Sequence, residues 1–192
     1  MLAADMDAFS YLSVLISLIL GLAITQVLKG FRGLMHARTR IRGYWPAVLW
    51  AVLIIVISVQ SWWSMFGLRH HEDWTFLEFS AVLAQTIVLY LLAALVLPDF
   101  FGETGFDLRA HYYDHHRWFF ALLVALIGVS IVKSRFVYGE WPHPLNFAYH
   151  LVFATTGLVC ACTRNARFHE VMTVVAVFSI GSYIALLFTY LT

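Results

Sequence analysis

The chain has 192 residues, of which 61% are hydrophobic and only 12% are charged. Soluble globular proteins carry about 25% charged residues, so a soluble fold of this size is excluded, and disorder is excluded because disordered chains are poor in apolar residues. The net charge of +1 offers no basic face for a nucleic-acid partner. The composition therefore predicts an all-α polytopic transmembrane helical bundle, forming a single domain over 1–192 in contact with the lipid bilayer.

Six hydrophobic stretches follow in chain order, at about 9–28, 46–66, 76–97, 118–132, 146–163 and 171–190. Most approach the ~20 residues needed to cross the hydrocarbon core as a helix. The segments 29–45 and 98–117 are expected to be the longest loops. The first stretch is preceded by Asp5 and Asp7 and by no Lys or Arg, so it is expected to be a retained span and not a cleaved signal peptide.

The basic residues alternate between the loops. Nine of the 12 Lys and Arg residues fall on one side of the predicted membrane: Lys29, Arg32, Arg38, Arg40, Arg42, Arg109, Arg117, Arg164 and Arg167. The other side carries Arg69, Lys133 and Arg135. Because basic loops stay in the cytoplasm, this distribution predicts that both termini lie outside the cytoplasm.

Small residues form a stripe along the first span. Ser13, Ser17, Gly21 and Thr25 recur every four residues, which places them on one helix face. Such a stripe permits close helix packing, either within the chain or in an oligomer. We expect packing within the chain, which makes the first span the candidate for the central helix.

Two short matches relate the halves of the chain. Trp45-Pro46 and Trp141-Pro142 precede or open spans two and five, and Phe76-x-Glu78 and Phe168-x-Glu170 open spans three and six. They are compatible with a 3+3 inverted repeat, an arrangement that places binding sites at the repeat interface. The alternative is that these are ordinary interfacial residues at helix starts.

Few strongly polar residues lie within the spans, and such residues commonly mark functional sites. A site open to the outside is predicted from Gln60, Glu78, Gln85, Lys133 and His150, which fall at compatible depths. Glu78 and Lys133 would form a charge pair, and protonation of His150 would gate the site. Alternatively, Glu78 and Lys133 extend to the headgroups and the glutamines bond between helices.

A histidine-rich motif precedes the fourth span. His111-Tyr-Tyr-Asp-His115-His116 has the spacing found in the histidine boxes of membrane di-iron enzymes, and in a helix His111 and His115 would share a face. Those enzymes need several boxes and this chain has one, so His111, His115 and His116 are only a remote metal-site hypothesis. No cofactor is predicted, and no nucleophile–base, phosphate-loop or paired-carboxylate motif indicates an enzyme.

The run from Phe9 to Gly21 and the segment Trp74-Thr-Phe-Leu-Glu78-Phe79 resemble a family of small multi-pass bacterial inner-membrane proteins with no assigned activity. The resemblance implies location in the bacterial inner membrane. The leading hypothesis is a channel, transporter or sensor for a small solute or ion, acting as a homo-oligomer. The alternatives are a non-catalytic subunit or scaffold of a membrane complex and, remotely, a histidine-box metal enzyme.

Overall fold

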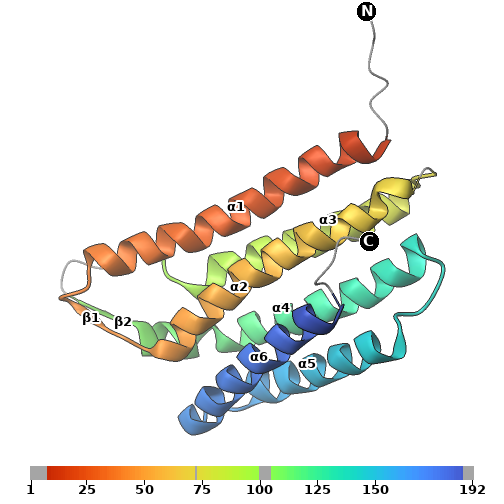
Figure 1. The fold of residues 1–192 in the computed structure, drawn as a ribbon. Helices are drawn as coiled ribbons and strands as arrows, with labels where there is room; N and C mark the ends of the chain where they lie inside the picture. The colour runs from red at the N-terminus through yellow and green to blue at the C-terminus, as the bar shows by residue number, and fades with distance from the viewer. Residues whose placement is uncertain (1–7, 72, 100–104, 188–192) are drawn as a thin grey trace, which may run out of the picture.

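Six long helices form the bundle in the computed structural model, which describes residues 8–71, 73–99 and 105–187. In chain order they are α1 (Ala8–His36), α2 (Trp45–Ser64), α3 (Phe76–Val96), α4 (Leu108–Val137), α5 (Pro144–Cys162) and α6 (Ala166–Leu187). Successive helices run in opposite directions, and all six are long and apolar enough to cross a membrane (Figure 1). The predicted helical bundle is confirmed, and the chain is a multi-pass membrane protein.

The α4 helix is longer than its predicted span. It begins at Leu108, so the predicted loop over 98–117 is wrong in its second half. The cause is a side-chain cap: the carboxylate of Asp107 accepts hydrogen bonds from the backbone N–H groups of Arg109 (2.8 Å) and Ala110 (3.0 Å). The first span likewise continues as helix α1 to His36, and residues 188–190 of the predicted last span lie outside the described residues.

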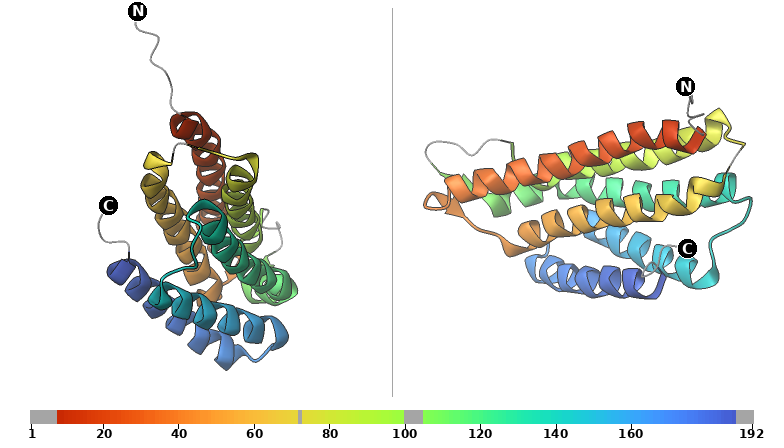
Figure 2. Two further views of the ribbon diagram at one scale, coloured as in Figure 1. Left: turned by 90° about the vertical axis from the view of Figure 1, so that its right-hand side faces the viewer. Right: turned by 45° about the horizontal axis from the view of Figure 1, so that its top comes forward.

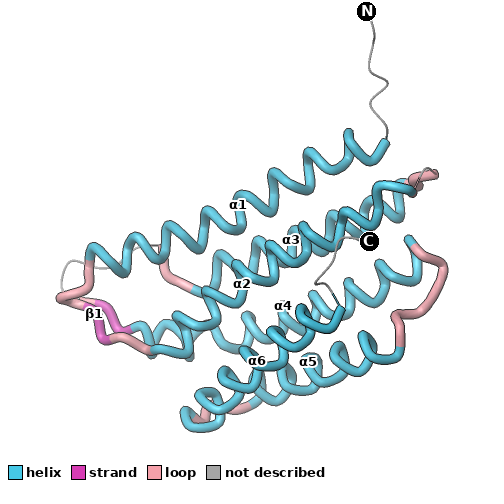
Figure 3. The backbone as a smooth tube through the Cα atoms, viewed as in Figure 1, coloured by secondary structure: helices cyan, strands magenta, loops and turns pink. Residues whose placement is uncertain are grey.

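Two loops are joined at one end of the bundle. The short strand β1 (Ile41–Arg42) pairs in parallel with β2 (Phe106–Asp107), so that the α1–α2 connection is held to the α3–α4 connection (Figures 1 and 3). Gly105 precedes β2 with φ of 123°, a conformation that L-residues rarely adopt. At the opposite end, the six-residue 3-10 helix η1 (Met65–His70) continues α2.

The α3 and α4 helices lie at the centre of the bundle. They pack along each other, and α3 also packs along α1 while α4 packs along α5. Viewed end-on, α1 lies at one edge and α5 and α6 lie at the other (Figure 2, left). The expectation that the first span is the central helix is therefore wrong.

The small-residue stripe of α1 faces away from the rest of the chain. Ser17, Gly21 and Thr25 are exposed, and a Cβ at Gly21 would meet no atom within 4 Å. The close approach occurs instead at Gly30, where a Cβ would lie 2.6 Å from the Cβ of Leu97. Packing of the stripe within the chain, as expected from sequence, does not occur.

The sequence matches between the two halves occupy non-equivalent positions. Pro46 lies in the first turn of α2, whereas Trp141-Pro142 precede α5, which begins at Pro144. Glu78 is the third residue of α3, and Glu170 is the fifth residue of α6. Helix α1 packs along α3, but within the described residues α4 has no comparable packing with α6. These differences do not support the inverted repeat, which stays a prediction.

Candidate intramembrane site

A cavity of about 100 Å³ lies inside the bundle, and every helix except α1 contributes to its wall. This volume is smaller than the ~150 Å³ of a protein cavity that holds benzene, so it has room for a few water molecules or one small solute. Most of the wall is apolar. Its polar side chains are Gln60, Ser61, Gln85, Ser130, His150 and Tyr183. The cavity thus brings together three residues of the predicted site, namely Gln60, Gln85 and His150.

The polar side chains of the cavity wall lie toward the end of the bundle where α2, α4 and α6 end and where α3 and α5 begin. At 1.5 Å per residue, Gln60 lies about 6 Å from the end of α2 and Gln85 about 14 Å from the start of α3. His150 lies about 9 Å from the start of α5. This end is the one that carries the fewer Lys and Arg residues.

The ring of His150 is held by both of its nitrogens. Nδ1 lies 2.7 Å from the carbonyl oxygen of Asn146, and since a carbonyl only accepts, Nδ1–H donates. In the neutral imidazole, Nε2 then accepts from the hydroxyl of Ser130 on α4, 3.1 Å away. His150 thereby connects α5 to α4, and its ring orientation is set before any solute enters.

Two buried polar groups of the cavity wall lack a hydrogen-bond partner in the described part of the chain: the indole N–H of Trp50, which is a donor, and the amide oxygen of Gln85, which is an acceptor. The Gln85 side chain is 7% exposed, and its Oε1 atom is buried with no hydrogen-bond partner in the described part of the chain. Leaving such an acceptor unpaired costs roughly 1–3 kcal/mol. Gln85 sits in the middle of α3, at the centre of the bundle, and is one of the residues that line the cavity.

Three wall residues were not included in the predicted site. Tyr183 on α6 donates its hydroxyl to Oδ1 of Asn146 at 3.1 Å, which joins α6 to the residue that anchors His150. Ser61 and Ser130 also face the cavity. Serine and tyrosine are common in membrane helices, and their spacing carries no signal that distinguishes a cavity wall from a helix contact.

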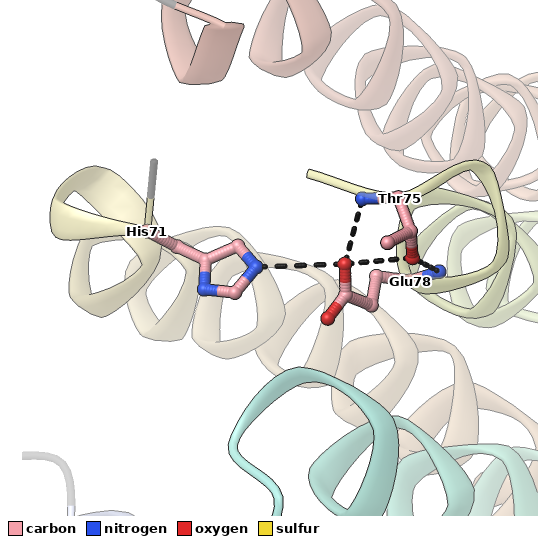
Figure 4. Close-up of polar contacts among 3 residues, drawn as sticks. All are labelled: His71, Thr75 and Glu78. Atoms are coloured by element: carbon pink, nitrogen blue, oxygen red, sulfur yellow. Dashed lines mark hydrogen bonds and ion pairs between the residues drawn. The ribbon is translucent and has the colours of Figure 1, made fainter. Parts of the chain in front are cut away.

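Glu78 is used at the start of α3 and does not line the cavity. Its Oε2 atom accepts hydrogen bonds from the backbone N–H and the hydroxyl of Thr75, both at 2.7 Å, while the Thr75 hydroxyl accepts from the Glu78 N–H (Figure 4). This reciprocal arrangement is a capping box. Nε2 of His71 lies 3.6 Å from the same carboxylate oxygen (Figure 4).

The expected pair between Glu78 and Lys133 is absent, because the carboxylate is engaged by Thr75 and His71. Lys133 lies one helical turn beyond Ser130 on α4 but is not part of the cavity wall. Among the described residues, the Lys133 ammonium has no ion pair with a carboxylate. The five residues of the predicted site are therefore divided, with three at the cavity and two nearer the end of the bundle.

The histidines of the predicted metal motif do not converge. His111 and His115 share a face, with ring centroids 4.4 Å apart, but His116 lies on another side of α4 with its ring 5.9 Å from that of His169. The His111 ring contacts the carbonyl of Leu95. Within residues 8–71, 73–99 and 105–187, no three His, Cys, Asp or Glu side chains are grouped so as to hold a metal ion.

His169 instead anchors a buried polar cluster that sequence reasoning missed. Its Nε2–H donates to the carbonyl of Thr163 (3.0 Å), and its Nδ1 accepts from the hydroxyl of Tyr112 (2.9 Å). His116 donates from Nδ1 to the carbonyl of Tyr113, but its Nε2 is buried without a hydrogen-bond partner in the described residues. These residues come from α4, from the α5–α6 turn and from the first turn of α6, and only the folded chain brings them together.

A second, much smaller cavity of about 10 Å³ adjoins this cluster. Its wall consists of Trp50, Leu95, Val96, Tyr112, His115, His116 and Phe119. Nearby, Tyr44 precedes α2 and has its hydroxyl 3.1 Å from that of Tyr113. Burial and this hydroxyl contact raise the pKa of Tyr44 well above its usual value, so the phenol stays neutral.

The fold and this interior define a polytopic helical membrane protein with a mostly apolar cavity that carries a few polar side chains. Comparisons with protein-family models, with curated proteins and with solved structures find no match. The chemistry of the cavity is therefore the basis on which a function can be assigned.

Proposed function

We propose that the protein binds a small uncharged polar solute in the cavity at Gln85 and passes it through the membrane. The observation that carries this proposal is the buried, unpaired Oε1 of Gln85 in the wall of a 100 Å³ cavity. An unpaired acceptor in an apolar surrounding favours a ligand that brings a hydrogen-bond donor.

The wall chemistry supports an uncharged solute over an ion. Its polar groups are amides, hydroxyls and the imidazole of His150, and no Asp, Glu, Lys or Arg is among the lining residues. An ion entering such a cavity would lose its water without gaining a counter-charge, which is costly in a low-dielectric interior. A donor-bearing molecule of a few heavy atoms, such as urea or glycerol, matches both the size and the polarity.

The proposal also covers the membrane in which the protein lies, its orientation there and its oligomeric state. The charge distribution of the loops supports an orientation with both termini outside the cytoplasm. The resemblance of the segments 9–21 and 74–79 supports a location in the bacterial inner membrane. The cavity then opens from the outer half of the bundle. The exposed stripe of Ser17, Gly21 and Thr25 on α1 is compatible with a homo-oligomer, because small residues permit close helix contacts between subunits.

Solute flux in proteoliposomes tests the proposal. We expect urea or glycerol flux, followed by stopped-flow light scattering, to fall about tenfold in Gln85→Leu, since one lost buried hydrogen bond corresponds to roughly that factor. Thermal stability should be unchanged or higher in this variant, because an unpaired acceptor is removed.

The matched control is Thr86→Val. Thr86 is the next residue of α3, is also buried, and donates its hydroxyl to the carbonyl of Leu83 in its own helix (2.8 Å). Equal flux through Gln85→Leu and Thr86→Val would refute the proposal. Absence of flux in every form would favour the alternative of a scaffold subunit.

A further inference from the structure

The two cavities lie one after the other along a single face of α4. On α4, the smaller cavity (the lower cavity) is lined by Tyr112, His116 and Phe119 among others. The larger cavity (the upper cavity) is lined on the same helix by Leu123, Leu126 and Ser130 among others. These residues recur every three or four positions, as a continuous helix face requires. From Tyr112 to Ser130 the face extends about 27 Å, close to the ~30 Å thickness of the hydrocarbon core. The α4 residues that line the two cavities therefore cover most of the depth of the membrane.

One side chain separates them. Trp50 on α2 is in the wall of both cavities and is 3% exposed. Its ring makes edge contacts with Phe119 (centroids 5.4 Å apart, 72° between planes) and Phe120 (5.4 Å, 84°). The three aromatic rings form a barrier between the polar side chains of the upper cavity and the histidine cluster below, and the indole N–H of Trp50 is buried without a hydrogen-bond partner in the described residues.

An unpaired acceptor lies on each side of this barrier. Above it is Oε1 of Gln85, and below it is Nε2 of His116, whose side chain is 2% exposed. Because Nδ1–H of His116 donates to the carbonyl of Tyr113, Nε2 of the neutral ring carries the lone pair. The lower cavity has a volume of about 10 Å³, which is room for about one water molecule, so a solute bound at Gln85 would reach the acceptor of His116 only when the barrier moves.

We infer that Trp50 is the gate of a path through the bundle, and that His116 is the second binding position for the same small uncharged hydrogen-bond donor. In the arrangement described, the indole closes the path between the two cavities. Displacement of the indole from Phe119 and Phe120 joins them. This inference rests on the proposed function, because it assigns the exit route of the solute that Gln85 binds.

Flux of urea and glycerol through Trp50→Ala and Trp50→Phe proteoliposomes tests the gate. Removing the indole takes away the barrier, so flux should rise about tenfold in Trp50→Ala and by a smaller factor in Trp50→Phe. Trp50→Phe keeps an aromatic ring in the core and remains informative if Trp50→Ala does not fold. In the Trp50→Phe background, His116→Leu should lower the raised flux again.

Trp62→Ala is the matched control, since Trp62 lies on the same helix, is 55% exposed and lines neither cavity. Flux in both Trp50 variants equal to that of Trp62→Ala would overturn the gate. Entry of sucrose into the Trp50→Phe vesicles would also overturn it, because a disrupted bundle leaks without selection by size.

The gate and the proposed function can fail separately. If Gln85→Leu lowers flux but neither Trp50 variant raises it, the gate is wrong and the binding site at Gln85 stands. If the Trp50 variants raise flux and Gln85→Leu has no effect in either background, the path is supported and the role of Gln85 is wrong.

Discussion

Most hydroxyl groups inside the bundle are satisfied by the helix to which they belong. Ser58 donates to the carbonyl of Ile54 (2.7 Å) and Thr173 to that of His169 (2.7 Å), so these buried side chains need no other partner. Gln85 and His116 differ, because each keeps a buried acceptor unpaired next to a cavity. At the scale of single residues, this difference separates side chains available to a solute from those used by the fold.

The role of Glu78 gives a prediction at this scale. Thr75→Ala and Glu78→Ala should each lower the free energy of unfolding by about 1 kcal/mol, because each breaks the capping box of α3. Their double variant should lose less than the sum, since both remove the same hydrogen bonds. The measurement is reversible unfolding in detergent micelles.

Lys133→Met is the comparison for that experiment. Glu78 is bonded to Thr75 and not to Lys133, so the effects of Glu78→Ala and Lys133→Met should add. A coupling energy above about 0.5 kcal/mol between these two positions would show that the carboxylate and the ammonium interact after all.

At the scale of the helices, α1 is attached through one face only. Its buried residues are Ile16, Leu20, Ala23, Val27 and Gly30, which recur every three or four positions. The stripe of Ser17, Gly21 and Thr25 lies on a different face, away from the bundle. The position of α1 against α3 is therefore set by these buried residues. The contact between Gly30 and Leu97 limits the size of the side chain that position 30 can carry.

Two glycines of α1 test this assignment. Gly30→Ala should destabilise the protein by about 1–3 kcal/mol, because its Cβ would lie 2.6 Å from that of Leu97 and force the helices apart. Gly21→Ala should be neutral or stabilising by less than about 1 kcal/mol, because its Cβ meets open space and alanine favours helix. Unfolding in micelles measures both, and equal effects would mean that α1 packs through the other face.

At the scale of the whole molecule, the loops gather at two ends of the bundle that differ in charge. The end held by β1 and β2 carries most of the Lys and Arg residues, and the other end carries Arg69, Lys133 and Arg135. The larger cavity lies toward the second end. Orientation in the membrane therefore decides from which side the proposed solute would first reach Gln85.

Labelling of single cysteines tests the proposed orientation. In a variant with Cys160→Ala and Cys162→Ala, Glu140→Cys and Thr39→Cys place one thiol in an exposed loop at either end of the bundle. A membrane-impermeant maleimide should label Glu140→Cys in intact cells and Thr39→Cys only after the membrane is opened, as the positive-inside distribution requires. The reverse pattern would place the termini in the cytoplasm and the larger cavity on the inner side.

The sequence by itself determined that the protein lies in a lipid bilayer, how many helices it has, and how deep in the membrane its polar residues lie. Composition and segment length suffice for these, because a lipid core admits only long apolar helices. Depth along each helix was enough to propose Gln60, Gln85 and His150 as neighbours.

Only the tertiary structure decided which helix face turns inward. In water, hydrophobicity distinguishes the interior from the surface, but lipid tails are as apolar as a leucine core, so the pattern of α1 did not reveal that its small residues face outward. Likewise, no spacing in the sequence placed Trp50 between two cavities or brought His116 near His169, since these contacts join helices that are distant along the chain. Local capping by Thr75 holds Glu78 at the start of α3, whereas the sequence had suggested a partner for it across the bundle.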